Sequence, residues 1–291
     1  MKKVVRIMGL CALVALAFTA CKKNDNTNKV TFTATITQPT TEGRTHINNV
    51  GQNQLVWDNG DEIEVYNKLG EHYTFTANTA EQMTTVFDVP GDKASFLANI
   101  ETSNEYSAFY PNVVPVENDV NLVIEATQNY RPNSFNTDTY PMYATNNGDN
   151  FEFHSNAGVL LVLIDKGNGN DVTVGSVELS CPGDNLAGTL VYSSDYPIDP
   201  SAAGAKCEVE LGSTSDVVTL NCGAEGALVQ GDPKWFFFVL LEGALDNKPF
   251  TVTFKDLNGN DIKSFSAVGS EANKIVAEKI VQMPAVSFNI Q

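Results

Sequence analysis

The chain has 291 residues, with 35 acidic against 18 basic side chains and a formal net charge of −17 at pH 7. So acidic a chain offers no basic surface to nucleic-acid phosphates and no electrostatic attraction to an anionic membrane, which excludes nucleic acid as an expected partner. Apolar residues make up 42% of the sequence, as in ordinary globular proteins, and the length suits one large all-β domain or two smaller ones.

The first 21 residues have the layout of a secretory signal. Basic residues come first, an apolar run of about 12 residues follows, and small residues precede Cys21, whereas a membrane-spanning helix needs about 20 apolar residues. The segment Leu16–Cys21 resembles the lipobox of bacterial lipoproteins, in which removal of the signal exposes a cysteine that is then acylated. We expect a signal peptide over residues 1–20, lipid such as palmitate on Cys21, and a polar tether over residues 21–29. The alternative is ordinary secretion with a coincidental cysteine.

Residues 30–148 are expected to form a first β domain. Val30–Ile36 alternates apolar residues with Thr, the pattern of a half-buried strand. Turn sequences separate further short strand patterns, namely Gln54–Trp57, Glu62–Asn67, His72–Ala77, Thr85–Val89, Glu105–Tyr110 and Asn121–Ile124. This spacing favours a β-sandwich. The Asn-rich stretch 126–150 is expected to be mainly loop, with the domain boundary near its end.

Residues 149–291 are expected to form a second β domain. Its Val159–Ile164 run is typical of a strand buried on both faces. Residues 270–281 fit either a helix or an irregular strand. Val286–Ile290 alternates in the same way as Val30–Ile36. The remaining strand patterns are Val172–Leu179, Ala187–Tyr192, Trp235–Leu241, Phe250–Lys255 and Ile262–Ala267.

Cysteine spacing leaves one question open. Lys206–Leu211 and Val217–Cys222 are expected to pair as a hairpin, which would bring Cys207 close to Cys222. A disulfide between them is possible in an exported protein, and free buried thiols are an equal alternative.

The sequence shows no recognisable catalytic or metal-binding pattern. Its histidines, His46, His72 and His154, lack metal-ligand spacing, and neither a nucleophile elbow nor a phosphate-binding glycine loop occurs. The acidic turn beginning at Asp256 has Asp261 where a calcium loop needs Gly. We therefore expect no catalytic residue, no metal, no cofactor and no enzymatic activity.

Aromatic residues in the 126–150 stretch offer an alternative function. Tyr130, Phe135, Tyr140 and Tyr143 lie among several Asn residues, and rings combined with amides suit sugar binding. The same rings could instead pack the loop onto its sandwich. A surface-exposed glycan-binding lipoprotein is therefore the alternative interpretation.

The segment Trp57–Tyr66 carries a family resemblance. It reads Trp-Asp-Asn-Gly-Asp-Glu-Ile-Glu-Val-Tyr and resembles the Trp-x-x-Gly-Asp-x-Ile-x-Val-aromatic signature of fimbrillin-like (Mfa-like) lipoproteins. Gly60 would adopt a turn conformation that a Cβ disfavours, and Asp61 would bond nearby backbone N–H groups. The signature's apolar residues, Trp57, Ile63 and Val65, would enter the core. Arg44–Thr45, Ala108–Pro111 and Phe153–Ala157 also agree with the family.

The resemblance implies a fold and a role. The fold would be two transthyretin-like Greek-key β-sandwich domains after a lipoprotein signal peptide. The protein would be a fimbrial (pilus) structural subunit or tip adhesin, carried as a lipoprotein to the surface of the outer membrane. Its partners would be other fimbrial subunits, and its adhesion ligand would lie on a host or bacterial surface.

The resemblance also implies an assembly mechanism. In the family, a protease cuts after an Arg, an N-terminal strand is lost, and a strand of the next subunit replaces it. Here the cut would fall at Arg44–Thr45 and would free the strand of Val30, Phe32 and Ile36. The donor would be the C-terminal strand, through Val286, Phe288 and Ile290. Alternatively, Arg44 is only an exposed loop residue and the C-terminal strand completes its own domain.

Overall fold

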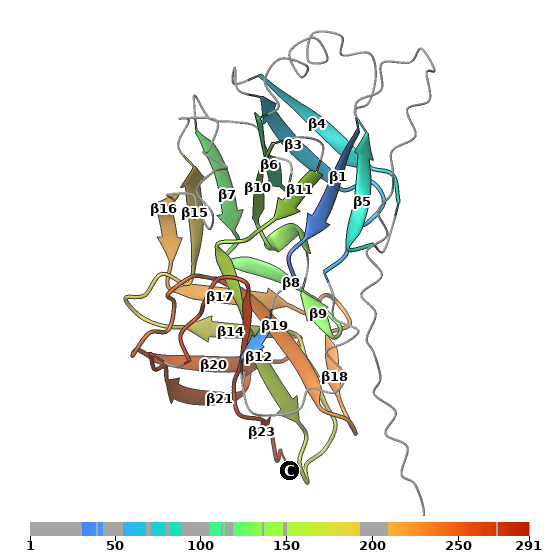
Figure 1. Ribbon diagram of the computed structural model, residues 1–291. Helices are drawn as coiled ribbons and strands as arrows, with labels where there is room; N and C mark the ends of the chain where they lie inside the picture. Colours follow the sequence, from blue (N-terminus) through green and yellow to red (C-terminus); the bar gives the residue numbers. More distant parts are fainter. Residues whose placement is uncertain are drawn as a thin grey trace, which may run out of the picture.

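The computed structural model describes residues 31–38, 40–42, 55–67, 71–79, 82–88, 105–111, 113, 119–135, 137–147, 150–192, 209–271 and 273–290. The expected signal peptide and tether, residues 1–29 with Cys21, lie outside these ranges, as do Val30, Arg44, Thr45, His46 and Cys207. Strands make up nearly all the regular structure of the described part, which confirms the all-β class. Figure 1 shows the strands gathered in an upper and a lower body.

The upper body is built on a seven-stranded sheet with the order β10-β6-β3-β4-β5-β1-β11. Its edge strands, β10 and β11, meet again through two backbone hydrogen bonds of 2.8 Å between Tyr143 and His154, so the sheet curls around its own core. The strands are β1 (Thr31–Ile36), β3 (Glu62–Asn67), β4 (His72–Ala77), β5 (Thr84–Asp88), β6 (Glu105–Tyr110), β10 (Met142–Asn147) and β11 (Asn150–Phe153).

A three-stranded sheet with the order β16-β15-β7 packs against this curl. It consists of β7 (Val120–Ile124), β15 (Ala187–Tyr192) and β16 (Val209–Ser215). The Tyr192 ring lies 5.3 Å from Phe109 and 5.6 Å from Tyr143, measured between ring centroids, and so joins the two sheets.

The lower body has two larger sheets. The first has the order β19-β12-β22-β2, with β23 also paired to β12, and the second has the order β21-β20-β14-β17-β8-β9. Contact between the Phe236 and Phe254 rings, 5.5 Å apart, joins the two sheets in one core. The first sheet contains β2 (Thr40–Glu42), β12 (Ala157–Asp165), β19 (Lys234–Leu241), β22 (Lys279–Gln282) and β23 (Val286–Ser287).

The second of these sheets contains β8 (Thr127–Arg131), β9 (Ser134–Phe135), β14 (Ser176–Ser180), β17 (Val217–Asn221), β20 (Pro249–Lys255) and β21 (Asp261–Val268). A short pair, β13 (Val172–Val174) with β18 (Ala227–Val229), and one 3-10 turn, η2 (Thr137–Thr139), complete the described elements. The expected strand buried on both faces is confirmed, because Val159–Val162 are at most 2% exposed.

Five expectations about individual elements were wrong. The described part of the Gln54–Trp57 pattern, Leu55–Trp57, forms no strand and makes only an isolated bridge between Trp57 and Gln82. The 126–150 stretch holds β8, β9, η2 and β10, because distant strands β17 and β6 supply its backbone partners. The 206–222 hairpin does not form, since β16 pairs with β15 while β17 pairs with β14 and β8. The 172–179 pattern divides at Gly175, where a Cβ would lie 2.5 Å from the Asp256 carbonyl oxygen. The Val286–Ile290 pattern gives only the two-residue β23.

Strand pairing crosses the expected boundary near residue 148. β11 follows that boundary in the chain but pairs with β1, and β8 precedes it but pairs with β17. The segment 31–42 itself joins both bodies, because β1 belongs to the upper sheet and β2 lies at the edge of a lower one, beside β22. The two bodies are therefore connected by hydrogen-bonded strands as well as by the chain.

Candidate functional site

The first described strand, β1, is surrounded by the rest of the upper sheet. It runs antiparallel to β5 and parallel to β11, so both of its backbone edges are paired. We call the position between β5 and β11, together with the core side chains beneath it, the β1 seat. Figure 1 shows β1, in dark blue, among the strands of the upper body.

The inward side chains of β1 are fully covered. Phe32 and Ala34 are 0% exposed and Ile36 is 3% exposed. The Phe32 ring centroid lies 5.0 Å from those of Phe75 and Phe151, and 5.3 Å from that of Tyr106. Burial of the two large side chains contributes about 3–6 kcal/mol at about 1.5–3 kcal/mol each. The outward residues of β1 are Thr31, Thr33 and Thr35, which explains the alternation in the sequence.

Trp57 of the signature segment packs directly under β1. Its indole Nε1–H donates a 3.1 Å hydrogen bond to the Ala34 carbonyl, although β1 and Trp57 are far apart in sequence. Its ring makes edge contacts with Phe87, Tyr110 and Phe153 at 5.0–5.3 Å. Trp57, the most conspicuous residue of the signature, therefore contacts β1, the strand that the expected cleavage would remove.

The rest of the signature forms the turn that leads into β3. Gly60 has φ +94°, and the Asp58 N–H donates a 2.7 Å hydrogen bond to Asp61 Oδ2. Burial raises the pKa of the Asp61 carboxyl, and the nearby carboxylates of Asp58 and Asp138 raise it further. Ile63 and Val65 are 0% exposed. These placements agree with the roles expected for Gly60, Asp61, Trp57, Ile63 and Val65, and each of them is structural.

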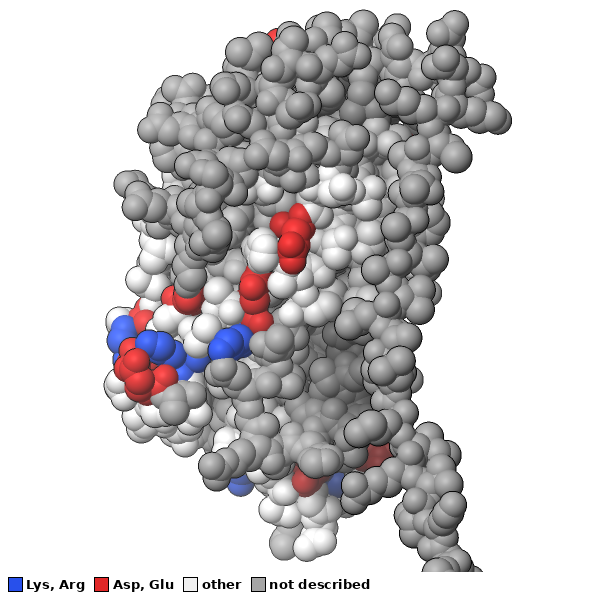
Figure 2. Space-filling view, in the orientation of Figure 1, with Lys and Arg blue, Asp and Glu red and all other residues white. Residues whose placement is uncertain are grey.

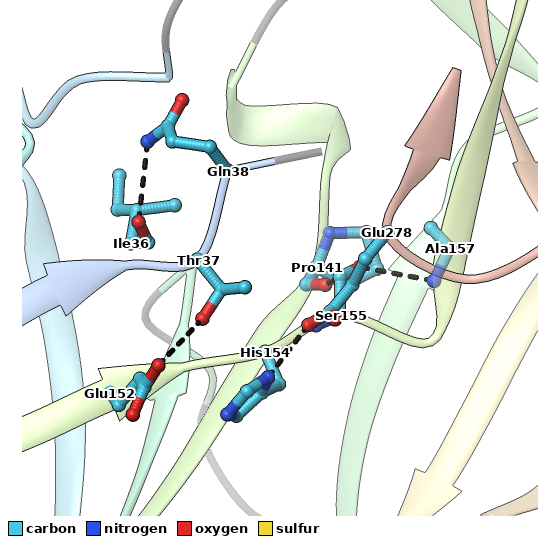
Figure 3. Close-up of polar contacts among 9 residues, drawn as sticks. All are labelled: Ile36, Thr37, Gln38, Pro141, Glu152, His154, Ser155, Ala157 and Glu278. Atoms are coloured by element: carbon cyan, nitrogen blue, oxygen red, sulfur yellow. Dashed lines mark hydrogen bonds and ion pairs between the residues drawn. The ribbon is translucent and has the colours of Figure 1, made fainter. Parts of the chain in front are cut away.

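A glutamine that sequence reasoning missed holds the chain just beyond β1. Gln38 Nε2 donates to the Leu55 carbonyl at 2.9 Å, and the Leu55 N–H donates back to Gln38 Oε1 at 2.8 Å. The Thr37 N–H donates to the Phe153 carbonyl at 3.0 Å. Figure 3 shows Thr37 and Gln38 at this end of β1, with Thr37 directed toward Glu152. A lone Gln after a strand carries no sequence signal for such a clamp.

His154 joins two parts of the chain that are far apart in sequence. Its Nδ1 lies 2.8 Å from Glu278 Oε1, which also accepts a 3.1 Å hydrogen bond from the Ser155 N–H (Figure 3). The hydrogen bond with Glu278 raises the pKa of His154, although partial burial opposes it. Because His154 follows β11 and Glu278 precedes β22, this ion pair links the upper and lower bodies.

The C-terminal strand residues lie apart from the β1 seat. Val286 pairs with Ile164 of β12, and Phe288 is 0% exposed, with its ring 5.0 Å from that of Phe254. The Phe288 N–H donates to the Asp165 carbonyl, and the Asn170 N–H donates to the Ile290 carbonyl, both at 2.9 Å. Figure 1 shows β23 at the bottom of the lower body. The structure therefore does not bring the C-terminal residues together with Phe32 and Ile36.

The aromatic residues of the glycan-binding alternative are covered. Phe135, Tyr140 and Tyr143 are 4%, 1% and 7% exposed, and the half-buried Tyr130 ring packs on Phe236 at 5.2 Å. Burial raises the pKa of Tyr130 to about 12. Stacking on a sugar needs an exposed ring face, so these rings do not form a binding platform. These rings instead pack their segment into the core, as in the second interpretation given for them in the sequence analysis.

Other site chemistry is sparse in the described part of the chain. Cys181 and Cys222 are free thiols, with Cys181 buried and Cys222 half-buried. Among those same residues, no cluster of three or more His, Cys, Asp and Glu side chains is arranged to hold a metal ion. The helices of the described ranges include none with the length and apolarity to cross a bilayer.

Charge on the visible face is mixed. Figure 2 shows described basic side chains at the lower left, interspersed with acidic ones, in the region of β14, β20 and β21. Lys255 of β20 and Glu178 of β14 form an ion pair, with Nζ and Oε2 3.0 Å apart.

Comparison with known proteins gave structural neighbours only. No protein-family model and no curated protein matches the sequence. A candidate cell adhesion protein from Bacteroides ovatus has a TM-score of 0.50 and 13% identity, and the alignment covers 85% of this chain and 88% of that one. A candidate cell adhesion protein from Bacteroides uniformis has a TM-score of 0.48 and 16% identity, covering 89% of this chain and 93% of that one.

A fimbrial protein from Bacteroides ovatus, at a TM-score of 0.45 and 10% identity, covers 91% of this chain and 50% of that one. At such low identities only the fold is informative. The chain shares its all-β fold with the candidate cell adhesion protein from Bacteroides ovatus, at a TM-score of 0.50.

Proposed function

We propose that this chain is a cell-surface adhesin or fimbrial subunit of the fimbrillin type, and not an enzyme. The fold that it shares with a candidate cell adhesion protein supports this role, and so does the contact between the signature tryptophan and β1. In this proposal Cys21 carries lipid, which anchors the protein at the outer membrane. Its partners are other fimbrial subunits, and a ligand on a host or bacterial surface completes adhesion.

The observation that carries the proposal is the place of β1 in the fold. A cut at Arg44–Thr45 would separate β1 and β2 from all later strands in a single step, since both precede it. Loss of the detached segment would leave the paired edges of β5 and β11 and the contacts of Phe32, Ala34 and Ile36 unfilled. Unpaired strand edges beside apolar pockets strongly favour addition of another strand.

The segment would not be expelled by the cut alone. Three strand ladders, those of β1 with β5 and β11 and that of β2 with β22, would still hold it, together with the Gln38–Leu55 hydrogen bonds and three buried side chains. In the proposed mechanism, the incoming strand therefore replaces a bound one and supplies equivalent contacts. Val30, Phe32 and Ile36 belong to the leaving strand.

Cells that produce the chain provide the test. Immunogold electron microscopy should label surface fibres or adhesive structures with the unaltered chain. Cys21→Ser should abolish retention in the outer membrane, and Arg44→Ala should leave a surface monomer that retains residues 21–44. Arg131→Ala, which alters an exposed arginine elsewhere, is the matched control. Label confined to the periplasm, or fibres that persist in Arg44→Ala, would contradict the proposal.

A further inference from the structure

The β1 seat is selective because its three inward positions have different sizes. The first accepts an aromatic ring, since Phe32 is enclosed by Phe75, Tyr106 and Phe151 at 5.0–5.3 Å. The third accepts a branched aliphatic side chain, Ile36, aligned with Phe153 of β11.

The middle position accepts only a small side chain. Ala34 is 0% exposed and is aligned with Thr85 on β5 and Phe151 on β11, both of them buried. Its carbonyl also accepts the Trp57 hydrogen bond, which fixes the backbone close to the indole ring. A larger side chain would have to displace packed neighbours, and such overpacking is destabilising.

The chain's own C-terminal tail does not satisfy this order of sizes. In the register that aligns its apolar face with β1, Phe288 faces the position of Ala34, and a shift of two residues brings Ile290 or Val286 there instead. A shift of one residue turns Ser287 and Asn289 inward, where their polar groups would be buried. Reversing the strand direction again places Phe288 in the middle.

The tail also has its own position in the lower body. A Cβ on Gly169 would lie 2.5 Å from the backbone N and O of Ile290, and a Cβ on Gly167 would lie 2.1 Å from Asn289 Oδ1. Two residues without side chains thus allow the tail to lie against the turn after β12. Phe288 meanwhile fills the core beside Phe254.

From these contacts we propose that the β1 seat takes a strand whose inward residues are aromatic, small and aliphatic in that order, supplied by another polypeptide and not by the C-terminal tail of a second copy. This inference rests on the proposed function, because it names the partner that strand exchange would use. In this proposal the chain accepts a strand from a different subunit.

Peptide replacement tests the proposal with the full chain. A specific protease site is inserted between residues 44 and 45, and the folded protein is cut there. The cut protein is then unfolded in urea and refolded with increasing excess of a fluorescent peptide of residues 29–42, which competes with the native segment. Native mass spectrometry measures the bound fraction.

Three altered peptides test whether the β1 seat selects by the order of side-chain sizes. The first carries Ala34→Phe. The second replaces residues 32–36 with the tail sequence 286–290, and the third is the same peptide with V286F and F288A, which restores the aromatic-small-aliphatic order. The first two should bind roughly 10- to 100-fold more weakly than the unaltered peptide. The third should recover most of the lost affinity.

Two results would overturn the inference: binding of the tail-sequence peptide within about threefold of the unaltered one, or failure of even the unaltered peptide to enter the seat. Size-selective binding combined with no surface assembly in cells would instead remove the proposed function and leave only the size selectivity of the β1 seat. Surface assembly combined with unselective binding would leave the proposed function intact and overturn the inference.

Discussion

The two ends of the described chain have similar sequences and different surroundings. Thr31–Ile36 and Val286–Ile290 both alternate three apolar residues with polar ones. β1 is paired along both edges by β5 and β11, whereas β23 is two residues long and pairs with β12 alone. The period-two pattern thus indicates which face is buried, but the arrangement of other strands decides whether a segment becomes a central strand or a docked tail.

The largest expected effect on stability comes from removing Phe32, the aromatic anchor of β1. Phe32→Ala should lower the free energy of unfolding by about 3–5 kcal/mol, because it opens a cavity among three rings. Urea unfolding followed by Trp fluorescence measures the change. Thr33→Ala, on the outward face of the same strand, is the control and should change stability by about 0.5 kcal/mol or less. Equal losses from both variants would show that β1 is not part of the core.

The second test loosens the tail without touching β1. Gly169→Ala places a methyl group against the backbone of Ile290 and should cost about 1–3 kcal/mol. Hydrogen–deuterium exchange should become faster in residues 286–290 and stay unchanged in β1. Asn168→Ala, an exposed side chain in the same turn, should leave exchange of the tail unaltered. Faster exchange throughout β1 would show that the two ends are coupled and that the comparison fails.

The third test weakens the clamp at the end of β1. Gln38→Leu removes both hydrogen bonds to the buried Leu55 and a 3.2 Å hydrogen bond to the Ile36 carbonyl. It should cost about 1–2 kcal/mol, since these backbone groups lose their side-chain partner. After a cut in the 43–54 segment, the variant should also release residues up to the cut faster, as gel filtration can measure. Thr37→Ala removes only a 3.5 Å contact to Glu152 and serves as the control. An unchanged release rate for Gln38→Leu would mean that the clamp does not hold the segment.

The smallest effect concerns pH at the junction of the two bodies. The hydrogen bond with Glu278 raises the pKa of His154, so its stabilising contribution is complete below the unfolded value of about 6.5 and is lost as pH rises through the higher folded value. The His154 side chain is 42% exposed, so solvent limits the effect to about 1 kcal/mol or less. Urea unfolding at pH 6 and pH 9 should show this loss. Glu278→Gln should abolish it, and its persistence there would assign it to another group.

Sequence reasoning located strands well where the pattern was local. The bounds of β3, β4, β6 and β15 agree with the predicted ones, because alternation and turn residues lie within the segment itself. Strand prediction failed where the pairing strand is distant in the sequence. Thr127–Arg131 looks like a polar loop, yet it is a strand because β17 pairs with it. The predicted hairpin failed because consecutive strands β16 and β17 joined different sheets.

The site was predictable in part for the same reason. The signature segment identified Trp57, Gly60 and Asp61, whose roles are turn formation and burial. The contact of Trp57 with Ala34, the Gln38 clamp and the ion pair of His154 with Glu278 all join residues remote in sequence. A side chain's distant partner leaves no trace in its own neighbourhood, and only the fold brings the two together.

The most direct test of the exchangeable first strand is the intact mass of the protein recovered from assembled surface structures. The account predicts a chain that begins at Thr45, lacks the lipidated segment 21–44, and carries a strand from another polypeptide that co-purifies with it. An assembled chain that still begins at Cys21, with β1 covalently attached, would contradict it.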